Sequence, residues 1–326
     1  MKKTVKYGII GFGLHAVKRF IPAFSQTQHS ELVAIQKRNK EDVLEKQKQF
    51  DIPLGFTDPV DLAQSPEVDA IIVASPPALH KEQVIIAAEA GKHVMVEKPM
   101  AVSAAECEAM ITACRSNGAK LFAGFCMRFT SSMQKVREII HSGRLGKINI
   151  VQASFTFDAS ISPRTWLNDP VVSGGGPVAD LASHLLDILE YLLEQPIVEI
   201  TSIITPPYTK ATIEKRAVIS LKFKNDTLGT VTTTFDLPKE KTLAFYGSKA
   251  KLSICDFTEA GDEVTIEIRE DEDTRKITVF NENHFAKMID SFSESILADL
   301  PVLVPGAAGL ANQILIDKIY KQVREN

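Results

Sequence analysis

The sequence predicts a two-domain α/β protein: a doubly wound N-terminal Rossmann domain, then an α+β domain with a large, mainly antiparallel open sheet. Its 326 residues are too many for one typical core and suit two. Short β-branched apolar runs alternate with amphipathic stretches up to residue 123, which is typical of a parallel sheet covered by helices. Long strand-like runs dominate after that point. We therefore expect domains at residues 1–123 and 124–326.

The first domain is expected to contain parallel strands with helices between them. The expected strands are Val5–Ile10, Glu31–Gln36, Ala70–Ser75, His93–Glu97 and Lys120–Gly124. The expected helices are Ala16–Gln26, Lys40–Phe50, Pro77–Ala90 and Ser103–Asn117. The last two are followed by Gly91 and Gly118, as helix C-caps often are.

The second domain is expected to begin with a helix at Ser131–His141 and to continue as a series of strands separated by turn residues or charge. These strands are Lys147–Phe157, Ile197–Ile204, Ala217–Phe223, Leu228–Phe235, Leu243–Tyr246, Lys251–Cys255, Val264–Ile268 and Lys276–Phe280. An irregular, glycine-rich passage at Pro163–Pro177 precedes a helix at Ala179–Leu193, and helices at His284–Ala298 and Ala307–Arg324 close the chain.

Charge and composition favour small-molecule chemistry. The 41 acidic and 37 basic side chains leave a net charge of −4, so no basic excess indicates nucleic-acid or anionic-membrane binding. The apolar run behind Met1 is broken at Gly8 and resembles a first strand rather than a signal peptide. No stretch predicts a membrane helix, and the four cysteines show no metal-ligand spacing. We expect a cytoplasmic protein without a metal site.

A glycine loop follows the first expected strand. Gly11, Gly13 and Ala16 form a GxGxxA pattern between a strand and a helix. In that setting Gly11 permits the tight turn, Gly13 lets the backbone approach a pyrophosphate, and Ala16 allows close packing of helix on strand. The pattern predicts dinucleotide binding. The residues assigned to this loop are Gly11, Phe12, Gly13, Leu14 and His15.

The end of the second expected strand bears on the choice of cofactor. An acid at this point would bind the ribose 2′-hydroxyl of NAD, but the sequence places Lys37 and Arg38 there. Two adjacent cations suit a 2′-phosphate, so we expect NADP in preference to NAD. A solvated basic turn is the other interpretation.

Two further strand ends should lie at the same edge of the sheet. Ser75, Pro76 and His80 follow the run Ala70–Val73, and we assign all three to the cofactor site, although His80 lacks a chemical partner in the sequence and a structural role is favoured for it. Lys98 follows the strand that ends at Glu97. We assign Glu97 and Lys98 to the cofactor site as well.

Two distant motifs together resemble a known family. The run from Ser75-Pro76-Pro77 through His80 and Gly91–His93 to Glu97-Lys98-Pro99, and the glycine run Gly174–Gly176 followed by Asp180 and His184, resemble the signatures of the Gfo/Idh/MocA oxidoreductases. The resemblance implies hydride transfer between a nicotinamide and the carbinol carbon of a sugar, a polyol or a related small alcohol.

Three side chains are predicted to carry the chemistry. Asp180 and His184 are four residues apart on a helix and so share a face. His184 can take the hydroxyl proton as hydride leaves, and Lys98 can stabilise the developing alkoxide. Asp180 would orient the substrate or the imidazole. Without the upstream motifs, a satisfied core histidine would be the favoured interpretation of His184.

Some positions depart from the pattern of the family. Cys126 stands where an asparagine often precedes the arginine by two residues, and Leu167 follows Trp166 where relatives often carry an arginine. The resemblance still places Arg128 and Trp166 at the cofactor, with Arg128 holding it or linking the domains. The missing arginine leaves the substrate class open.

Two other functions remain possible at this stage. The resemblance extends to lyases and glycosidases that use the cofactor transiently without net consumption, and a non-catalytic dinucleotide sensor is the third possibility. The run Val218–Phe223 places apolar groups on both faces of its strand, which predicts a homodimer or homotetramer formed through the C-terminal sheet.

Overall fold

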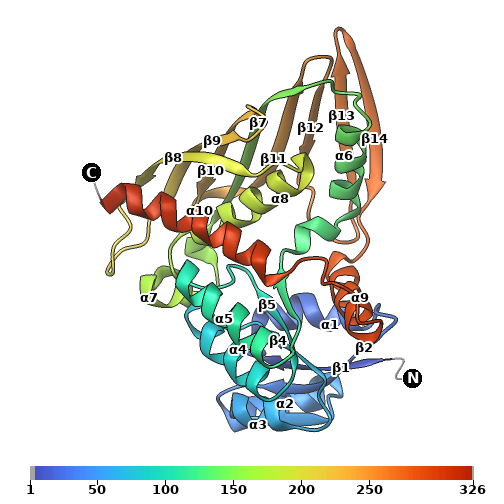
Figure 1. Ribbon diagram of the computed structural model, residues 1–326, viewed down its shortest axis with the longest axis vertical. Helices are drawn as coiled ribbons and strands as arrows, with labels where there is room; N and C mark the ends of the chain where they lie inside the picture. The colour runs from blue at the N-terminus through green and yellow to red at the C-terminus, as the bar shows by residue number, and fades with distance from the viewer. Residues whose placement is uncertain (1–3, 325–326) are drawn as a thin grey trace. The chain divides into compact units, whose positions relative to one another are not determined.

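The computed structural model describes residues 4–324, which form two compact units (Figure 1). The first unit contains residues 4–125 and Phe285–Gln313. The second contains Cys126–His284 and residues 314–324.

The first unit is built on a parallel sheet of six strands within the described residues. The strands are β1 (Val5–Ile10), β2 (Ser30–Gln36), β3 (Leu54–Phe56), β4 (Ala70–Val73), β5 (His93–Glu97) and β6 (Leu121–Gly124), in the order β3-β2-β1-β4-β5-β6. Every adjacent pair is parallel. The order reverses between β1 and β4, which is the switch point where ligands bind in such sheets.

Helices cover both faces of this sheet. They are a π-helical turn at Ala16–Phe20, α1 (Ile21–Phe24), α2 (Lys40–Phe50), α3 (Pro59–Gln64), α4 (His80–Glu89), α5 (Ala104–Ser116) and α9 (His284–Leu297). One face packs on side chains of α3, α4 and α5. On the other face Phe122 and Phe292 lie with ring centroids 5.3 Å apart, and Phe20 and Phe285 lie 5.5 Å apart. The arrangement is doubly wound, as predicted.

The first unit differs from expectation at several elements. The strand Leu54–Phe56 and the helix Pro59–Gln64 were not predicted, because three and six residues are too few to show a clear period. The helix expected at Ala16–Gln26 is shorter and begins with a π-helical turn. Helix α9, expected in the second domain, belongs to the first unit because its phenylalanines pack on the parallel sheet.

The second unit is built on an eight-stranded sheet within the described residues. Its strands are β7 (Ile148–Asp158), β8 (Ile197–Thr205), β9 (Arg216–Phe223), β10 (Leu228–Thr234), β11 (Asp236–Gly247), β12 (Lys251–Cys255), β13 (Glu263–Glu270) and β14 (Asp273–Phe280). The order is β14-β13-β12-β11-β7-β10-β9-β8, and neighbours are antiparallel except β7 and β10. The predicted fold class is confirmed.

Helices lie on one face of this sheet. Figure 1 shows α6 (Ser131–His141) and α8 (Ser183–Leu193) against the long strands. Residues from α6, α8 and the C-terminal half of α10 (Gly306–Arg324) join the strands in one hydrophobic core. The other face leaves apolar side chains open, with Ile203 78%, Leu228 53% and Val218 51% exposed.

Among residues 4–324, no helix combines the length and apolar character that a membrane span requires.

Candidate active site

The glycine loop follows β1 with the geometry that its sequence requires. Gly11 has φ +77°, and a Cβ there would lie 2.6 Å from the backbone nitrogen of Ser75, so both conformation and space demand glycine. A Cβ on Gly13 would meet only the Gly11 oxygen, at 3.8 Å, which leaves room beside the loop. The NH groups of the first helical turn have no partners inside a helix. Room of this kind beside Gly13 is what the close approach of a pyrophosphate would require.

The side chains of this loop differ in exposure. Phe12 is 1% exposed and packs edge-on against Phe50, so only its backbone can face a ligand. Leu14 is 43% exposed. His15 lies half-exposed, with its Nε2 atom 3.1 Å from Oε1 of Glu97.

The end of β2 holds the glycine loop through a residue that sequence reasoning missed. The buried amide of Gln36 accepts a hydrogen bond from the Gly11 nitrogen at 3.2 Å and donates one to the Thr57 oxygen at 2.8 Å. Lys37 donates to the Phe12 oxygen at 3.3 Å and pairs with Asp42 at 3.3 Å. Arg38 is exposed. Of the two cations, Lys37 supports the loop, whereas Arg38 is the more accessible to a phosphate.

His80 is buried between two backbone segments. Its Nε2 atom lies 2.7 Å from the Ser75 oxygen, and its Nδ1 atom lies 3.2 Å from the oxygens of Pro99 and Met100. Burial lowers the pKa of His80, although the carbonyl contacts and Glu97 oppose the shift. Both ring nitrogens thus contact the chain itself, which favours the structural role. His80 connects the β4 loop, with Ser75 and its neighbour Pro76, to the segment that follows Lys98.

Glu97 ends β5 and Lys98 follows it, at the same end of the parallel sheet as Gly11 and Ser75. The side chain of Glu97 is 10% exposed. Burial acts to raise the pKa of Glu97, but His15 and Lys98 outweigh it and hold the pKa below its ordinary value. The parallel sheet therefore gathers the glycine loop, Ser75, Glu97 and Lys98 at one edge.

In the second unit, Asp180 and His184 lie on one continuous helical segment, which we call the site helix. It consists of a π-helical turn, Val178–Ala182, followed by α8. Four residues span about one turn in either helix type, so the two side chains share a side of the helix. Asp180 is 9% exposed, and the His184 ring lies 6.1 Å from the ring of Phe155. Lys98 belongs to the other unit.

Arg164 is a second residue that sequence reasoning missed. Its Nη2 atom lies 3.3 Å from Oδ2 of Asp180, and its guanidinium lies 5.6 Å from the centroid of Phe157 and 5.8 Å from that of Trp166. Arg164 stands two positions before Trp166, whereas position 167, directly after it, holds Leu167. Trp166 itself is half-buried beside the core of the second unit, whereas Leu167 is buried.

Arg128 forms a largely buried ion pair with Asp187. Its Nη2 and Nε atoms lie 2.6 and 3.0 Å from the Asp187 carboxylate, and its guanidinium lies 5.2 Å from the Tyr191 ring. Burial raises the pKa of Asp187, and Arg128 only partly offsets that effect. Asp187 is 3% exposed, so the pair braces α8 against the Cys126–Phe129 turn. Contact of Arg128 or Trp166 with a cofactor stays a prediction.

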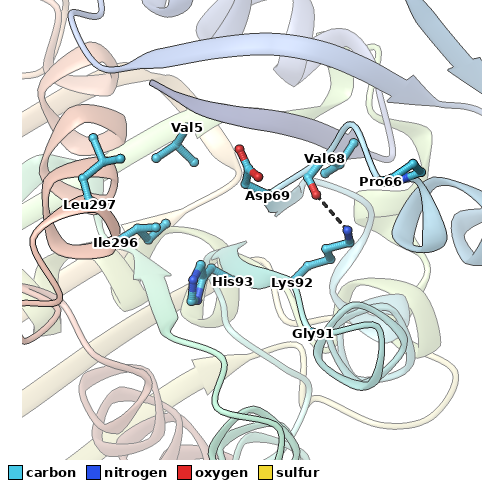
Figure 2. Close-up of a pocket in the computed structure, with 9 residues that line it drawn as sticks. All are labelled: Val5, Pro66, Val68, Asp69, Gly91, Lys92, His93, Ile296 and Leu297. Atoms are coloured by element: carbon cyan, nitrogen blue, oxygen red, sulfur yellow. Dashed lines mark hydrogen bonds between the residues drawn. The ribbon is translucent and has the colours of Figure 1, made fainter. Parts of the chain in front are cut away.

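A pocket of about 300 Å³ lies at the opposite edge of the parallel sheet (Figure 2). Val5, Asp69 and His93 line it from the amino ends of β1, β4 and β5, and Lys92 donates to the Val68 oxygen at its rim. No predicted site residue lines this pocket.

Within residues 4–324, no group of three or more His, Cys, Asp or Glu side chains is arranged to hold a metal ion.

The fold and the switch-point loop define a Rossmann-type dinucleotide-binding domain with a separate α+β unit. The chain belongs to the Gfo/Idh/MocA family: residues 5–125 match its oxidoreductase domain with the NAD-binding Rossmann fold, and residues 133–253 match a GFO/IDH/MocA C-terminal domain. The resemblance inferred from the two motifs is confirmed.

Three similar proteins illustrate the range of the family. Myo-inositol 2-dehydrogenase of Thermotoga maritima is 25% identical over 94% of this chain and 92% of its own length. Trans-1,2-dihydrobenzene-1,2-diol dehydrogenase of Mus musculus is 32% identical over 58% of this chain and 56% of its own. The crystal structure of aldose-aldose oxidoreductase from Caulobacter crescentus, in complex with glycerol, has a TM-score of 0.90 at 26% identity and covers 99% of this chain and 98% of its own.

Proposed function

We propose that this oxidoreductase transfers a hydride between a nicotinamide cofactor and the carbinol carbon of a sugar, a polyol or a related small alcohol. The observation that carries the proposal is Lys98, which directly follows β5 at the carboxyl end of the sheet, where Gly11 makes its required turn. A lysine at that edge meets the end of the sheet where ligands bind in Rossmann domains. The similar inositol, diol and aldose enzymes support an alcohol as substrate.

The bound nicotinamide would accept or supply the hydride, and residues of this chain would handle the proton. His184 takes the hydroxyl proton during oxidation and returns it during reduction, because imidazole titrates near neutral pH. The Lys98 ammonium donates a hydrogen bond to the same oxygen and stabilises the alkoxide as it forms. Asp180, which Arg164 contacts, orients the substrate hydroxyl or the imidazole.

The test is a turnover assay with NADP⁺ or NAD⁺ and a panel of polyols, inositols and aldoses. Net reduction of the cofactor, followed by its absorbance, is the expected result. Cleavage of a glycoside added to the panel, or formation of a dehydrated product, without net reduction of the cofactor would indicate the glycosidase or lyase alternative instead. Binding of cofactor with no conversion of any panel compound, in either direction, would favour a dinucleotide sensor.

We further propose that NADP is preferred to NAD. Arg38 is an exposed cation at the end of β2, and its neighbours in the sequence, Lys37 and Asn39, are not acids that could accept a ribose hydroxyl. Calorimetric titration should give tighter binding of NADP, and Arg38→Ala should weaken NADP binding by about tenfold while leaving NAD unchanged. Tighter binding of NAD by the wild-type protein would refute the preference.

We also propose that two or four copies of the chain associate through the outer face of the C-terminal sheet. Ile203, Val218 and Leu228 lie on that face, each more than half exposed. An apolar patch of this kind is typical of an interface. Light scattering should report a dimer or tetramer, and Ile203→Lys should shift it toward the monomer.

A further inference from the structure

Glu214 is a buried carboxylate that the proposed reaction does not use. It lies just before β9 and is 0% exposed. Its two oxygens accept hydrogen bonds from the Gly176 nitrogen at 3.0 and 3.1 Å, and Oε1 also accepts one from the Val178 nitrogen at 2.9 Å. These are backbone groups at the start of the site helix. Glu214 therefore acts as an N-cap for this helix, although it comes from a distant part of the chain.

A tyrosine from the C-terminal helix completes the arrangement. The Tyr320 hydroxyl donates to Oε1 of Glu214 at 2.9 Å, and the Tyr320 ring stacks on Tyr208 with centroids 4.3 Å apart. Burial raises the pKa of Tyr320 well above its ordinary value, so the hydroxyl remains a donor. Burial also raises the pKa of Glu214, but all three of these donors favour the carboxylate form.

The glycine run before the site helix makes room for these two side chains. Gly175 has φ +147°, and a Cβ there would lie 1.9 Å from the Tyr320 hydroxyl oxygen. A Cβ on Gly176 would lie 2.0 Å from the Glu214 backbone oxygen. Neither position tolerates a larger residue without displacing the Glu214 backbone or the Tyr320 phenol. The glycine run Gly174–Gly176, which is part of the family resemblance in the sequence, thus provides the space that Glu214 and Tyr320 occupy in this chain.

The anchored backbone leads directly to Asp180. The Asp180 nitrogen donates to the Gly176 oxygen at 3.0 Å. Gly176 therefore links the two residues: its NH group donates to Glu214, and its carbonyl oxygen accepts from Asp180. The turn that follows is π-helical, a rare conformation that concentrates at functional sites. A negative charge at the start of a helix is also favourable because of the helix dipole.

We propose that Glu214, held by Tyr320, is the positioning residue that fixes the first turn of the site helix and thereby orients Asp180 and His184. The inference rests on the proposed function for the roles of those two side chains. It assigns no contact between Glu214 and substrate. Loss of the carboxylate would let the π-helical turn relax, which rotates Asp180 relative to the alcohol.

The test compares Glu214→Gln with wild type. The amide keeps the size of the side chain but directs an NH₂ group toward donors. We expect kcat to fall by about tenfold to a hundredfold, because small misplacements of reacting groups cost this much. Affinity for the dinucleotide, which binds the first unit, should not change. The titration midpoint of the His184 imidazole, followed by NMR, should move.

A matched control lies on the same helix. Glu190 accepts a hydrogen bond from the Ile197 nitrogen at 2.7 Å, near the opposite end of the site helix. Glu190→Gln should leave kcat and the His184 titration unchanged. Tyr320→Phe should lower kcat and move the His184 titration as Glu214→Gln does, but by less. Tyr208→Phe removes a hydroxyl that contacts the Pro170 oxygen, so it should change neither quantity.

A folded Glu214→Gln protein with wild-type kcat and an unmoved His184 titration would overturn the proposal. If that variant does not fold, Tyr320→Phe decides in its place, with the same two measurements. If wild type converts no alcohol, the proposed function fails, but the His184 titration still reports whether Glu214 positions the helix.

Discussion

The two units hold their candidate site residues by different means. In the first unit, Gly11, Ser75 and Lys98 stand at one edge because parallel strands end there, and the supporting contacts come mainly from backbone groups and Gln36. In the second unit, the site helix is held by buried ionisable side chains, Glu214 at its start and Asp187 farther along. A short motif can reveal the first arrangement. The second depends on partners far away in the chain.

The largest expected effect concerns chemistry, to which both units are proposed to contribute. Lys98→Met and His184→Ala should each lower kcat by about a hundredfold or more, because each removes a group that acts on the reacting oxygen. Dinucleotide affinity should survive in His184→Ala. Steady-state kinetics and cofactor titration measure both. Lys81→Met, which changes a half-exposed lysine of the first unit, serves as the control. Full turnover in either site variant would remove that residue from the mechanism.

The next effect tests the buried support of the second unit. Asp187→Ala leaves Arg128 buried without its carboxylate, and removal of one partner from a buried pair costs about 3–5 kcal/mol. Urea denaturation should show this loss in the free energy of unfolding. Glu138→Ala breaks an exposed pair with Lys135 and should cost about 1 kcal/mol or less. Equal losses in the two variants would mean that burial of the Arg128 pair carries no energetic weight.

The corresponding change in the first unit is Gly11→Ala. It places a methyl group against the Ser75 backbone and forces a positive φ on alanine, which should cost about 1–3 kcal/mol and abolish dinucleotide binding. Gly118→Ala also has a positive φ, +67°, but open space around it. That control should lose some stability in thermal unfolding and keep its affinity. Retained binding by Gly11→Ala would show that the loop is not the cofactor site.

The smallest effect is a pH dependence that His80 introduces. Its pKa is lower in the folded protein than the ordinary 6.5, so below that pH the unfolded chain binds more protons. Stability should therefore fall as the pH drops from about 6.5 toward the folded-state pKa, by at most about 1.4 kcal/mol per pH unit. His93 contributes in the same direction. Urea unfolding at several pH values should give a shallower slope for His80→Gln than for wild type; identical slopes would contradict the assignment.

Most element boundaries were predictable because they follow local rules. β1, β5, α2 and α6 begin and end where periodicity, caps and turn residues place them. The strand Leu54–Phe56 was not predictable, since it exists through its pairing with β2 rather than through a pattern of its own. The same holds for α9, whose amphipathic sequence predicts a helix but does not specify which sheet it covers.

The glycine loop at Gly11, the lysine after β5 and the position of Asp180 and His184 on one helix could all be predicted from the sequence, because each depends on residues close together in the chain. Three contacts became visible only in the folded chain: Gln36 holds the loop, Arg164 contacts Asp180, and Glu214 and Tyr320 occupy the space left by Gly175 and Gly176. The physical reason is that buried polar groups must find partners, and the fold supplies them from any distance along the chain.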